Sequence, residues 1–407
     1  MRFLYVTAIK PATPIGKERT NKKLSVYLQA GHELAIVCGV EEGDCADVPD
    51  GVRLYPVRLN TTELPFNVID ALDETPLPSV HNNDELDIVK TSLEEAFADT
   101  IDTAVADFAP DVIVCSHLAI MTSIALDHAA GTPVAGISQS LYLSEFLNLE
   151  ATRKVMARNL QRLDLVFACS AAQRRLMVES FDIDPAKVKV LYGSFDVDFF
   201  TVQCSPELKE ATEPSINLSF VGKFTYKNGP RSLLNAVALL PCRPNAVTVR
   251  LCCNTDNSFQ RAALDLLIRE NPQKVEVVNL DDAQGLAQMF RESQVFVLPA
   301  FYNELPLHVL EALACGCKVV ATELPGLRDW LEESAPGASV YYVKPPRMQG
   351  LDEPLKCDIA DFEQRMADAI KEAVLAPLKP VDLSRLSWKL RCESVCSECA
   401  KLIKGGA

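Results

Sequence analysis

The residues most able to do chemistry begin with two lysines, Lys223 and Lys227, in the segment FVGKFTYKNG at 220–229. An apolar run typical of a buried strand precedes Gly222, and a helix-like pattern follows the segment. Because the segment lacks Gly-x4-Gly-Lys-Ser/Thr, it is not a Walker P-loop. Two ammonium groups in a loop after a strand suit a diphosphate. On spacing alone, two solvated loop lysines are the slightly favoured alternative.

A single carboxylate, Glu311, stands inside an otherwise apolar helical pattern. We expect this helix over about 305–315, after a buried strand at 295–298. Pro306 would lie near its first position and Gly316 would be its C-cap. A helix start suits a phosphate, and a buried carboxylate needs a partner in the protein or a ligand hydroxyl. Together these features would describe a nucleotide or a nucleotide sugar.

Two weaker candidates lie in the first half of the chain. Gly16 follows the first predicted strand and opens a helix, where a glycine lets backbone approach a phosphate. His117 follows a strand at 112–115, at the carboxyl end where doubly wound sheets place function. Many such loops hold a glycine, and a lone histidine near a strand end is more often structural. Neither residue by itself indicates a site.

A basic run consists of Lys17, Arg19, Lys22 and Lys23, with only Glu18 opposed. The ordinary interpretation is a solvated helix face. The alternative is peripheral contact with an anionic lipid surface or a phosphorylated acceptor.

The composition is that of an ordinary globular protein: of 407 residues, 48% are apolar and 23% are charged. The net charge of −15 argues against nucleic-acid binding. No apolar run approaches the ~20 residues needed to span a bilayer, and the first residues predict a strand rather than a signal peptide. We therefore expect a cytoplasmic protein, at most peripheral to a membrane, whose 14 cysteines are reduced.

Three of the cysteines, Cys392, Cys396 and Cys399, have a spacing that can hold an iron–sulfur cluster when it lies in a loop. Here the same spacing places all three on one face of a predicted helix. Core packing is therefore the better interpretation.

Strand-like and helix-like segments alternate along the chain, which predicts an α/β protein with parallel sheets and helices on both faces. Residues 193–215 are rich in turn formers and break the periodicity, so we place the domain linker there. We expect domains at 1–195 and 196–380, and a last helix within 381–407 that packs back toward the first domain. Two such domains usually leave a cleft in which ligands bind.

Taken together, these segments resemble the family 4 glycosyltransferases, retaining enzymes of the GT-B fold. The similarity is strongest in VFVLPAFYNELPLHVLEALACGCKVVATELPG at 295–326, where the family shows a Glu-x7-Glu element and Leu-Glu-Ala-Leu-Ala-Cys-Gly. FVGKFTYKNG looks like the diphosphate loop of the family. GHELAIVC, PDVIVCSHLA, the Ser170 region and GSFDVDFF match lesser landmarks in the right order, over nearly the whole chain. The resemblance implies two Rossmann-like domains that face each other across a cleft.

The resemblance also implies roles for the candidates. Lys223 and Lys227 would neutralise the diphosphate leaving group in place of a metal, so neither a metal nor another cofactor is expected. Glu311 would accept hydrogen bonds from the ribose hydroxyls, and His117 would lie near the transferred sugar. The acceptor would attack the face that the leaving group departs from, without a protein nucleophile. The remaining donor-binding positions would be Gly16, Gly222 and the backbone N–H groups near Leu305 and Leu307.

Two departures from the family pattern concern the sugar and the acceptor. Eight residues before Glu311 stands Asn303, where the family usually has its first glutamate, and Glu304 is one residue late. Either Glu304 serves through a slip in the loop, or Asn303 contacts sugar hydroxyls as a neutral amide. Gln139-Ser140 stands where many members have His-Gly, which bears on contacts with the acceptor.

The leading hypothesis is a retaining glycosyltransferase that moves a hexosyl unit from a nucleotide-diphosphate sugar to the hydroxyl of an unidentified acceptor. The alternative is a catalytically weak nucleotide-sugar-binding partner of another transferase, which Asn303 motivates. A sugar-nucleotide epimerase is less favoured, because it needs extra carboxylates in the first domain that do not stand out.

Overall fold

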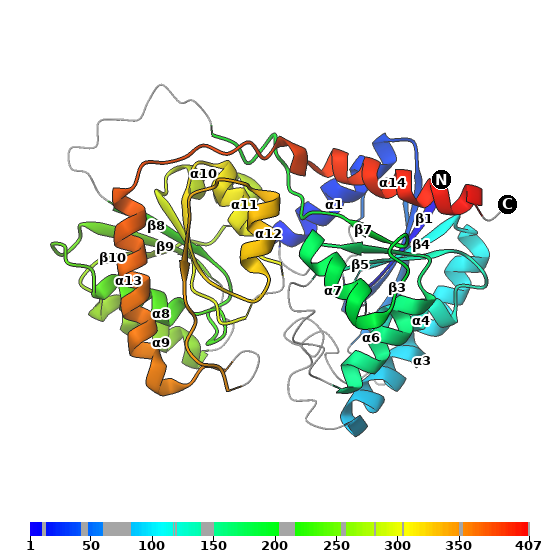
Figure 1. The fold of residues 1–407 in the computed structure, drawn as a ribbon, viewed down its shortest axis with the longest axis horizontal. Coiled ribbons are helices and arrows are strands. Elements are labelled where there is room, and N and C mark those ends of the chain that lie inside the picture. The colour runs from blue at the N-terminus through cyan, green and yellow to red at the C-terminus, as the bar shows by residue number, and fades with distance from the viewer. Residues whose placement is uncertain are drawn as a thin grey trace. The chain divides into compact units, whose positions relative to one another are not determined.

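The computed structural model forms two compact units, each with its own sheet (Figure 1). Unit 1 comprises Met1–Tyr192 and Trp388–Ala407, and unit 2 comprises Gly193–Ser387. The domain limits expected from the sequence were 195/196 and 380/381. The structure describes residues 1–9, 14–41, 48–59, 83–116, 118, 120–139, 150–202, 216–253, 258–280, 282–302, 305–349 and 353–405.

Within the described residues, unit 1 has a seven-stranded parallel sheet in the order β3-β2-β1-β4-β5-β6-β7. Its strands are β1 (Arg2–Ile9), β2 (Glu33–Glu41), β3 (Val52–Leu59), β4 (Val112–Ser116), β5 (Val134–Ile137), β6 (Leu165–Ala168) and β7 (Val188–Val190). Its helices are α1 (Pro14–Gln29), α3 (Asn83–Phe108), α4 (Ile120–Asp127), α6 (Glu150–Arg162), α7 (Ala171–Phe181) and α14 (Trp388–Gly405).

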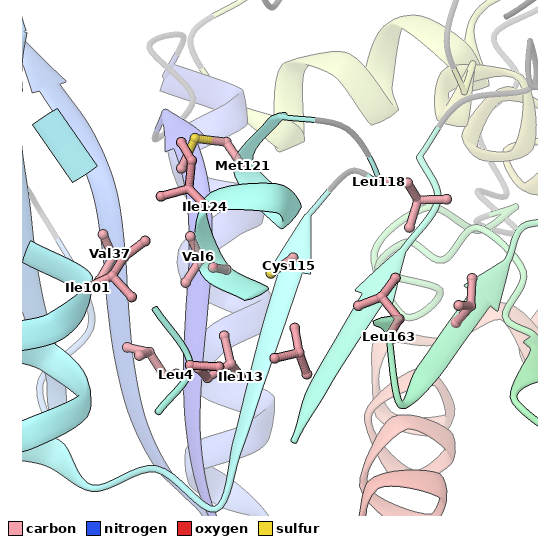
Figure 2. Close-up of a cluster of buried hydrophobic side chains, with 14 of the residues drawn as sticks. Leu4, Val6, Val37, Ile101, Ile113, Cys115, Leu118, Met121, Ile124 and Leu163 are labelled. Atoms are coloured by element: carbon pink, nitrogen blue, oxygen red, sulfur yellow. The ribbon is translucent and has the colours of Figure 1, made fainter. Parts of the chain in front are cut away.

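Successive side chains along the strands of this sheet pack into two separate hydrophobic cores, one on each face. Leu4 and Val6 of β1 join a cluster with α3, α4, α6 and α7, part of which Figure 2 shows. Phe3 and Tyr5 point to the opposite face and pack with α1 and α14. Because side chains of a strand alternate between faces, nearly continuous apolar strands are what a sheet covered on both sides requires.

The C-terminal helix α14 belongs to this second core. Cys392, Cys396 and Cys399 are buried there among residues of β1, β2 and α1. The core-packing interpretation of their spacing is therefore confirmed.

Unit 2 repeats the architecture with a six-stranded parallel sheet, among the described residues, in the order β10-β9-β8-β11-β12-β13. Its strands are β8 (Ile216–Val221), β9 (Val247–Cys252), β10 (Lys274–Val277), β11 (Val295–Leu298), β12 (Lys318–Thr322) and β13 (Val340–Val343). Its helices are α8 (Pro230–Ala238), α9 (Ser258–Glu270), α10 (Ala283–Arg291), α11 (Leu307–Ala314), α12 (Leu327–Ser334) and α13 (Ile359–Leu375), with short 3-10 turns η1 (Lys356–Asp358) and η2 (Ser384–Leu386).

The strand order reverses once in each sheet, between β1 and β4 in unit 1 and between β8 and β11 in unit 2. In open α/β sheets, ligands bind outside the carboxyl ends of the strands at such a reversal. Gly16 and His117 follow β1 and β4 along the chain, whereas Lys223 and Glu311 follow β8 and β11. The candidates from the sequence thus all follow the four strands that flank the two reversals.

The described helices range in length up to the 26 residues of α3. In the described part of the chain, none is long and apolar enough to cross a membrane.

Candidate functional site

The loop after β8 is held in shape by its own backbone. The N–H of Gly222 donates to the carbonyl of Cys252 on the neighbouring strand, at 3.1 Å. The carbonyl of Lys223 accepts from the Thr225 N–H at 2.9 Å and from Asn228 Nδ2 at 3.2 Å. The Lys223 side chain is exposed and that of Lys227 is half-buried. The loop therefore presents two ammonium groups from a fixed backbone.

This loop is joined to the chain that leaves β11. The carbonyl of Lys227 accepts from the N–H of Phe301 at 2.7 Å and from that of Tyr302 at 3.4 Å. The Lys227 ammonium also lies 5.9 Å from the centre of the Tyr302 ring. Gly229, at φ +70°, comes so close to Pro299 that an added Cβ would overlap the Pro299 carbonyl oxygen. Glycine is required here for both its backbone angle and the close approach.

The start of α11 differs from the sequence prediction. The helix begins at Leu307, two residues later than expected, and Pro306 is its N-cap rather than its first residue. Pro306 has φ −76° and ψ 72°, the angles of an inverse γ-turn, and the Leu307 N–H donates to the Leu305 carbonyl at 2.8 Å. In this turn, the N–H that follows the proline is hydrogen-bonded to the protein backbone. The expected contact between the Leu307 N–H and a diphosphate therefore requires this turn to open.

The C-terminal end of α11 agrees with the prediction. Gly316 adopts φ +91°, and its N–H donates to the Leu313 carbonyl while that of Cys317 donates to Ala312. This pair of bonds is a Schellman motif, which ends a helix with a left-handed glycine.

Glu311 has a partner within its own helix. His308 Nδ1 lies 3.0 Å from Glu311 Oε2. The Glu311 side chain is 1% exposed and that of His308 is 29% exposed, so the carboxylate is buried and its histidine partner is partly exposed. The sequence prediction missed His308. Its position three residues before Glu311, on the same helix face, was the signal that could have found it.

Gly193 packs behind the start of α11. A Cβ on this residue would lie 2.7 Å from Cδ2 of Leu307, 3.2 Å from Cζ2 of Trp330 and 3.6 Å from Cδ2 of Leu305. Trp330 is fully buried on α12. The GSFDVDFF landmark therefore begins with a glycine that makes room for Leu305 and for Leu307, the first residue of α11.

At the reversal of unit 1, the structure fixes the residue after His117. The carbonyl of Leu118 accepts from Asn159 Nδ2 at 3.1 Å, and its side chain lies against Gly136, where a Cβ would come within 2.7 Å. His117 itself, like Asn303 and Glu304, lies outside the described residues. Gly16 falls in the first turn of α1. The choice between Asn303 and Glu304 therefore stays as the sequence left it.

The basic run on α1 is not a uniform solvated face. Lys22 pairs with Glu18 at 2.9 Å. Burial and the nearby charge of Arg391 lower the pKa of Lys23 to about 7. Arg391 on α14 donates from Nη1 to the carbonyl of Tyr192 at 2.6 Å. Lys23 thus belongs to the contact between α1 and α14, and the side chain of Lys17 lies outside the described residues.

Solved structures share this fold. Sucrose-phosphate synthase from Thermosynechococcus elongatus has a TM-score of 0.67 at 16% identity, with 100% of both chains covered. HepE from Anabaena, crystallised with UDP and glucose, has a TM-score of 0.56 at 15% identity, with 100% of this chain and 98% of that chain covered. With the two parallel-sheet domains, this similarity shows a GT-B fold.

Among curated proteins, an uncharacterised glycosyltransferase of Methanocaldococcus jannaschii is 27% identical over 189 residues, which are 44% of this chain and 47% of that protein. D-inositol 3-phosphate glycosyltransferase of Corynebacterium jeikeium is 28% identical over 218 residues, 49% of this chain and 51% of that protein. The chain thus spans about half the length of the curated relatives it matches.

Two family models match consecutive parts of the chain. The 4-like glycosyl transferase domain matches residues 19–193, and the model described as glycosyl transferases group 1 matches residues 215–356. The two matches cover all six described strands of the unit 2 sheet and every described strand of the unit 1 sheet except β1. The chain therefore belongs to the group 1 family of glycosyl transferases, the family that its motifs resemble.

Proposed function

We propose that the protein is a retaining glycosyltransferase that moves a hexosyl unit from a nucleotide-diphosphate sugar to an acceptor hydroxyl. The observation that carries this proposal is the joining of two loops at the strand-order reversal of unit 2. The loop with Lys223 and Lys227 is bonded to the chain that leads into the helix with Glu311. Two cations and a buried carboxylate are thereby brought to one edge of one sheet.

This arrangement fits the two ends of a nucleoside diphosphate. Lys223 and Lys227 neutralise the diphosphate as it departs, which supplies the charge that a metal provides in other transferases. Gly222 and Gly16 let backbone approach the phosphates, and Glu311 accepts hydrogen bonds from the ribose hydroxyls.

The sugar end of the donor belongs to residues outside the described part of the chain. We propose that Asn303 or Glu304 binds the sugar hydroxyls and that His117 lies beside the transferred sugar. The acceptor attacks the face that the leaving group leaves, so the anomeric configuration is retained.

The comparisons support the class of donor. The HepE structures are described as complexes with UDP, with UDP and glucose, and with UDP-glucose. Several curated relatives are named D-inositol 3-phosphate glycosyltransferase. We extend from these proteins only the nucleotide-sugar donor.

The test is a panel of UDP, GDP and ADP sugars, first by thermal shift and then by sugar release. A ligand at 100 times its Kd stabilises a protein by about 2.7 kcal/mol, so a true donor raises the unfolding temperature measurably. Lys223→Ala should abolish turnover of that donor, whereas Lys371→Ala, at an exposed lysine of α13, should not. Wild-type turnover in purified, folded Lys223→Ala would refute the assignment.

The second candidate is a nucleotide-sugar-binding partner of another transferase. Asn303, in place of the family's first glutamate, favours it. Binding of a nucleotide sugar with neither transfer nor hydrolysis, in wild type and in Asn303→Glu, would select this candidate over the enzyme.

A further inference from the structure

His308 and Glu311 form a pair within the first turns of α11. His308 is the second residue of this helix, and the two side chains, three residues apart, lie on one helix face. The distance from His308 Nδ1 to Glu311 Oε2 is 3.0 Å. With 29% exposure, His308 lies nearer the surface than Glu311, which has 1%.

The chemistry of the pair fixes its hydrogen bond. An ionised carboxylate only accepts hydrogen bonds, so His308 Nδ1 must carry the proton that is shared with Glu311. The bond restricts the rotation of a glutamate side chain that otherwise has several rotamers. The two oxygens of a carboxylate offer about four lone-pair sites, so a bond to His308 leaves Glu311 able to accept from a ligand as well.

We infer that His308 is a positioning residue, which orients the Glu311 carboxylate so that it accepts hydrogen bonds from the ribose hydroxyls of the donor nucleotide. This inference rests on the proposed function, because it takes the nucleotide as the ligand of Glu311. It adds a residue that acts through Glu311 rather than on the donor itself. Without the imidazole, the carboxylate must be ordered at the moment of binding, and the nucleotide binds more weakly.

A purely structural role for His308 makes a different prediction. If the imidazole only satisfies a buried carboxylate, its removal weakens the fold, and any loss of affinity is the same for every ligand of the site. If the imidazole positions Glu311, the loss depends on the presence of the ribose hydroxyls. Ligands that lack those hydroxyls therefore separate the two roles.

The experiment measures the binding of the nucleoside diphosphate selected by the donor panel, and of its 2′,3′-dideoxy form, by calorimetry on the full chain. His308→Leu should weaken binding of the ribonucleotide roughly 10-fold or more and leave that of the dideoxy form within roughly twofold. His308→Asn places an amide N–H near the position of Nδ1 and should restore most of the affinity. His308→Gln places it near Nε2 and should not. The Asn and Gln variants decide the matter if the leucine variant does not fold.

The outcomes separate the inference from the proposed function. If wild type binds the nucleotide and the histidine variants lose ribonucleotide and dideoxynucleotide affinity equally, or lose neither, the inference is overturned and the proposed function stands. If wild type binds no nucleoside diphosphate at all, both are overturned. In a protein that already carries Glu311→Gln, adding His308→Leu should lower ribonucleotide affinity by less than twofold further. A second loss as large as that of His308→Leu alone would also overturn the inference.

Discussion

The backbone N–H of Phe301 donates to the carbonyl oxygen of Lys227 at 2.7 Å. This bond joins the loop after β8 to the loop after β11, which lie far apart in the sequence. A few residues away, the backbone at Gly229 lies against Pro299, so the same two loops are also in contact there. These contacts place the loop of Lys223 and Lys227 against the chain that leads to Glu311, so the geometry of the proposed donor site depends on them.

Gly229→Ala should disrupt the contact between these two loops. The added Cβ would overlap a backbone carbonyl, which cannot swing aside as the end of a side chain can. The left-handed backbone adds a penalty of its own, so we expect a loss of roughly 3 kcal/mol or more in the free energy of unfolding. Chemical denaturation of the full chain measures it. Gly337→Ala is the matched control, because Gly337 has φ +79° with nothing within 4 Å of its Cβ position, and it should cost only about 1–2 kcal/mol. Equal losses would contradict the prediction.

Gly193→Ala should disturb the start of α11. The new methyl group would press on Leu307 and on the buried Trp330, at a cost of about 1–3 kcal/mol in stability. Because Leu307 is the first residue of α11, the helix that we propose binds the nucleotide, affinity for a nucleoside diphosphate should also fall. Gly136→Ala meets two leucine side chains at similar distances in unit 1 and should lose stability without losing nucleotide affinity. Unchanged affinity in Gly193→Ala would show that α11 tolerates the shift.

Glu311→Leu should remove donor turnover and leave the fold intact. Replacing a buried ion pair by apolar side chains is often neutral or stabilising, whereas removing one partner is costly when the other stays buried and charged. His308 is partly exposed and can be hydrated once its partner is gone. We therefore expect an unfolding temperature equal to or above that of wild type, with no sugar release. Glu363→Leu serves as the control. Glu363 lies on α13 and accepts a hydrogen bond from Asn235 at 2.8 Å, and its replacement should not affect turnover. Retained sugar release in Glu311→Leu would remove Glu311 from the site.

Lys23→Met should stabilise the protein in a pH-dependent way. The pKa of Lys23 in the folded protein, about 7, lies below the unfolded value of about 10.4, because burial and Arg391 disfavour its charge. The unfolded chain therefore holds a proton that the folded protein releases between these values. Burying the charged Lys23 therefore lowers the free energy of unfolding by its full amount below pH 7, and by less as the pH rises toward 10.

We expect Lys23→Met to gain about 1–2 kcal/mol at pH 6, a value reduced because the side chain is only half-buried, and to gain little at pH 9.5. Thermal unfolding at the two pH values measures this difference. Lys22→Met, which breaks the exposed pair with Glu18, should change stability by less than about 1 kcal/mol at both. A gain that grows with pH would have the wrong sign.

The sequence by itself determined the two α/β domains and the segments after the strands in which the candidate residues lie. Apolar runs and helical periodicity are local patterns. They indicated the strands and helices but not the order of the strands within each sheet. Lys223, Lys227 and Glu311 stood out for the same reason, because a charged residue beside a buried strand or inside an apolar helix breaks a local pattern.

Only the tertiary structure decided which loops meet. The order of strands in a sheet depends on backbone hydrogen bonds between distant segments, which no local periodicity encodes, and that order put β8 beside β11. The turn at Pro306 and the pair of His308 with Glu311 are likewise seen only in the structure, where Leu307 fills the space beside Gly193. Such packing is set by the volume and shape of side chains that the fold brings together. The sequence therefore indicated the helix that carries Glu311, and the structure determined where this helix begins and which side chain lies beside its carboxylate.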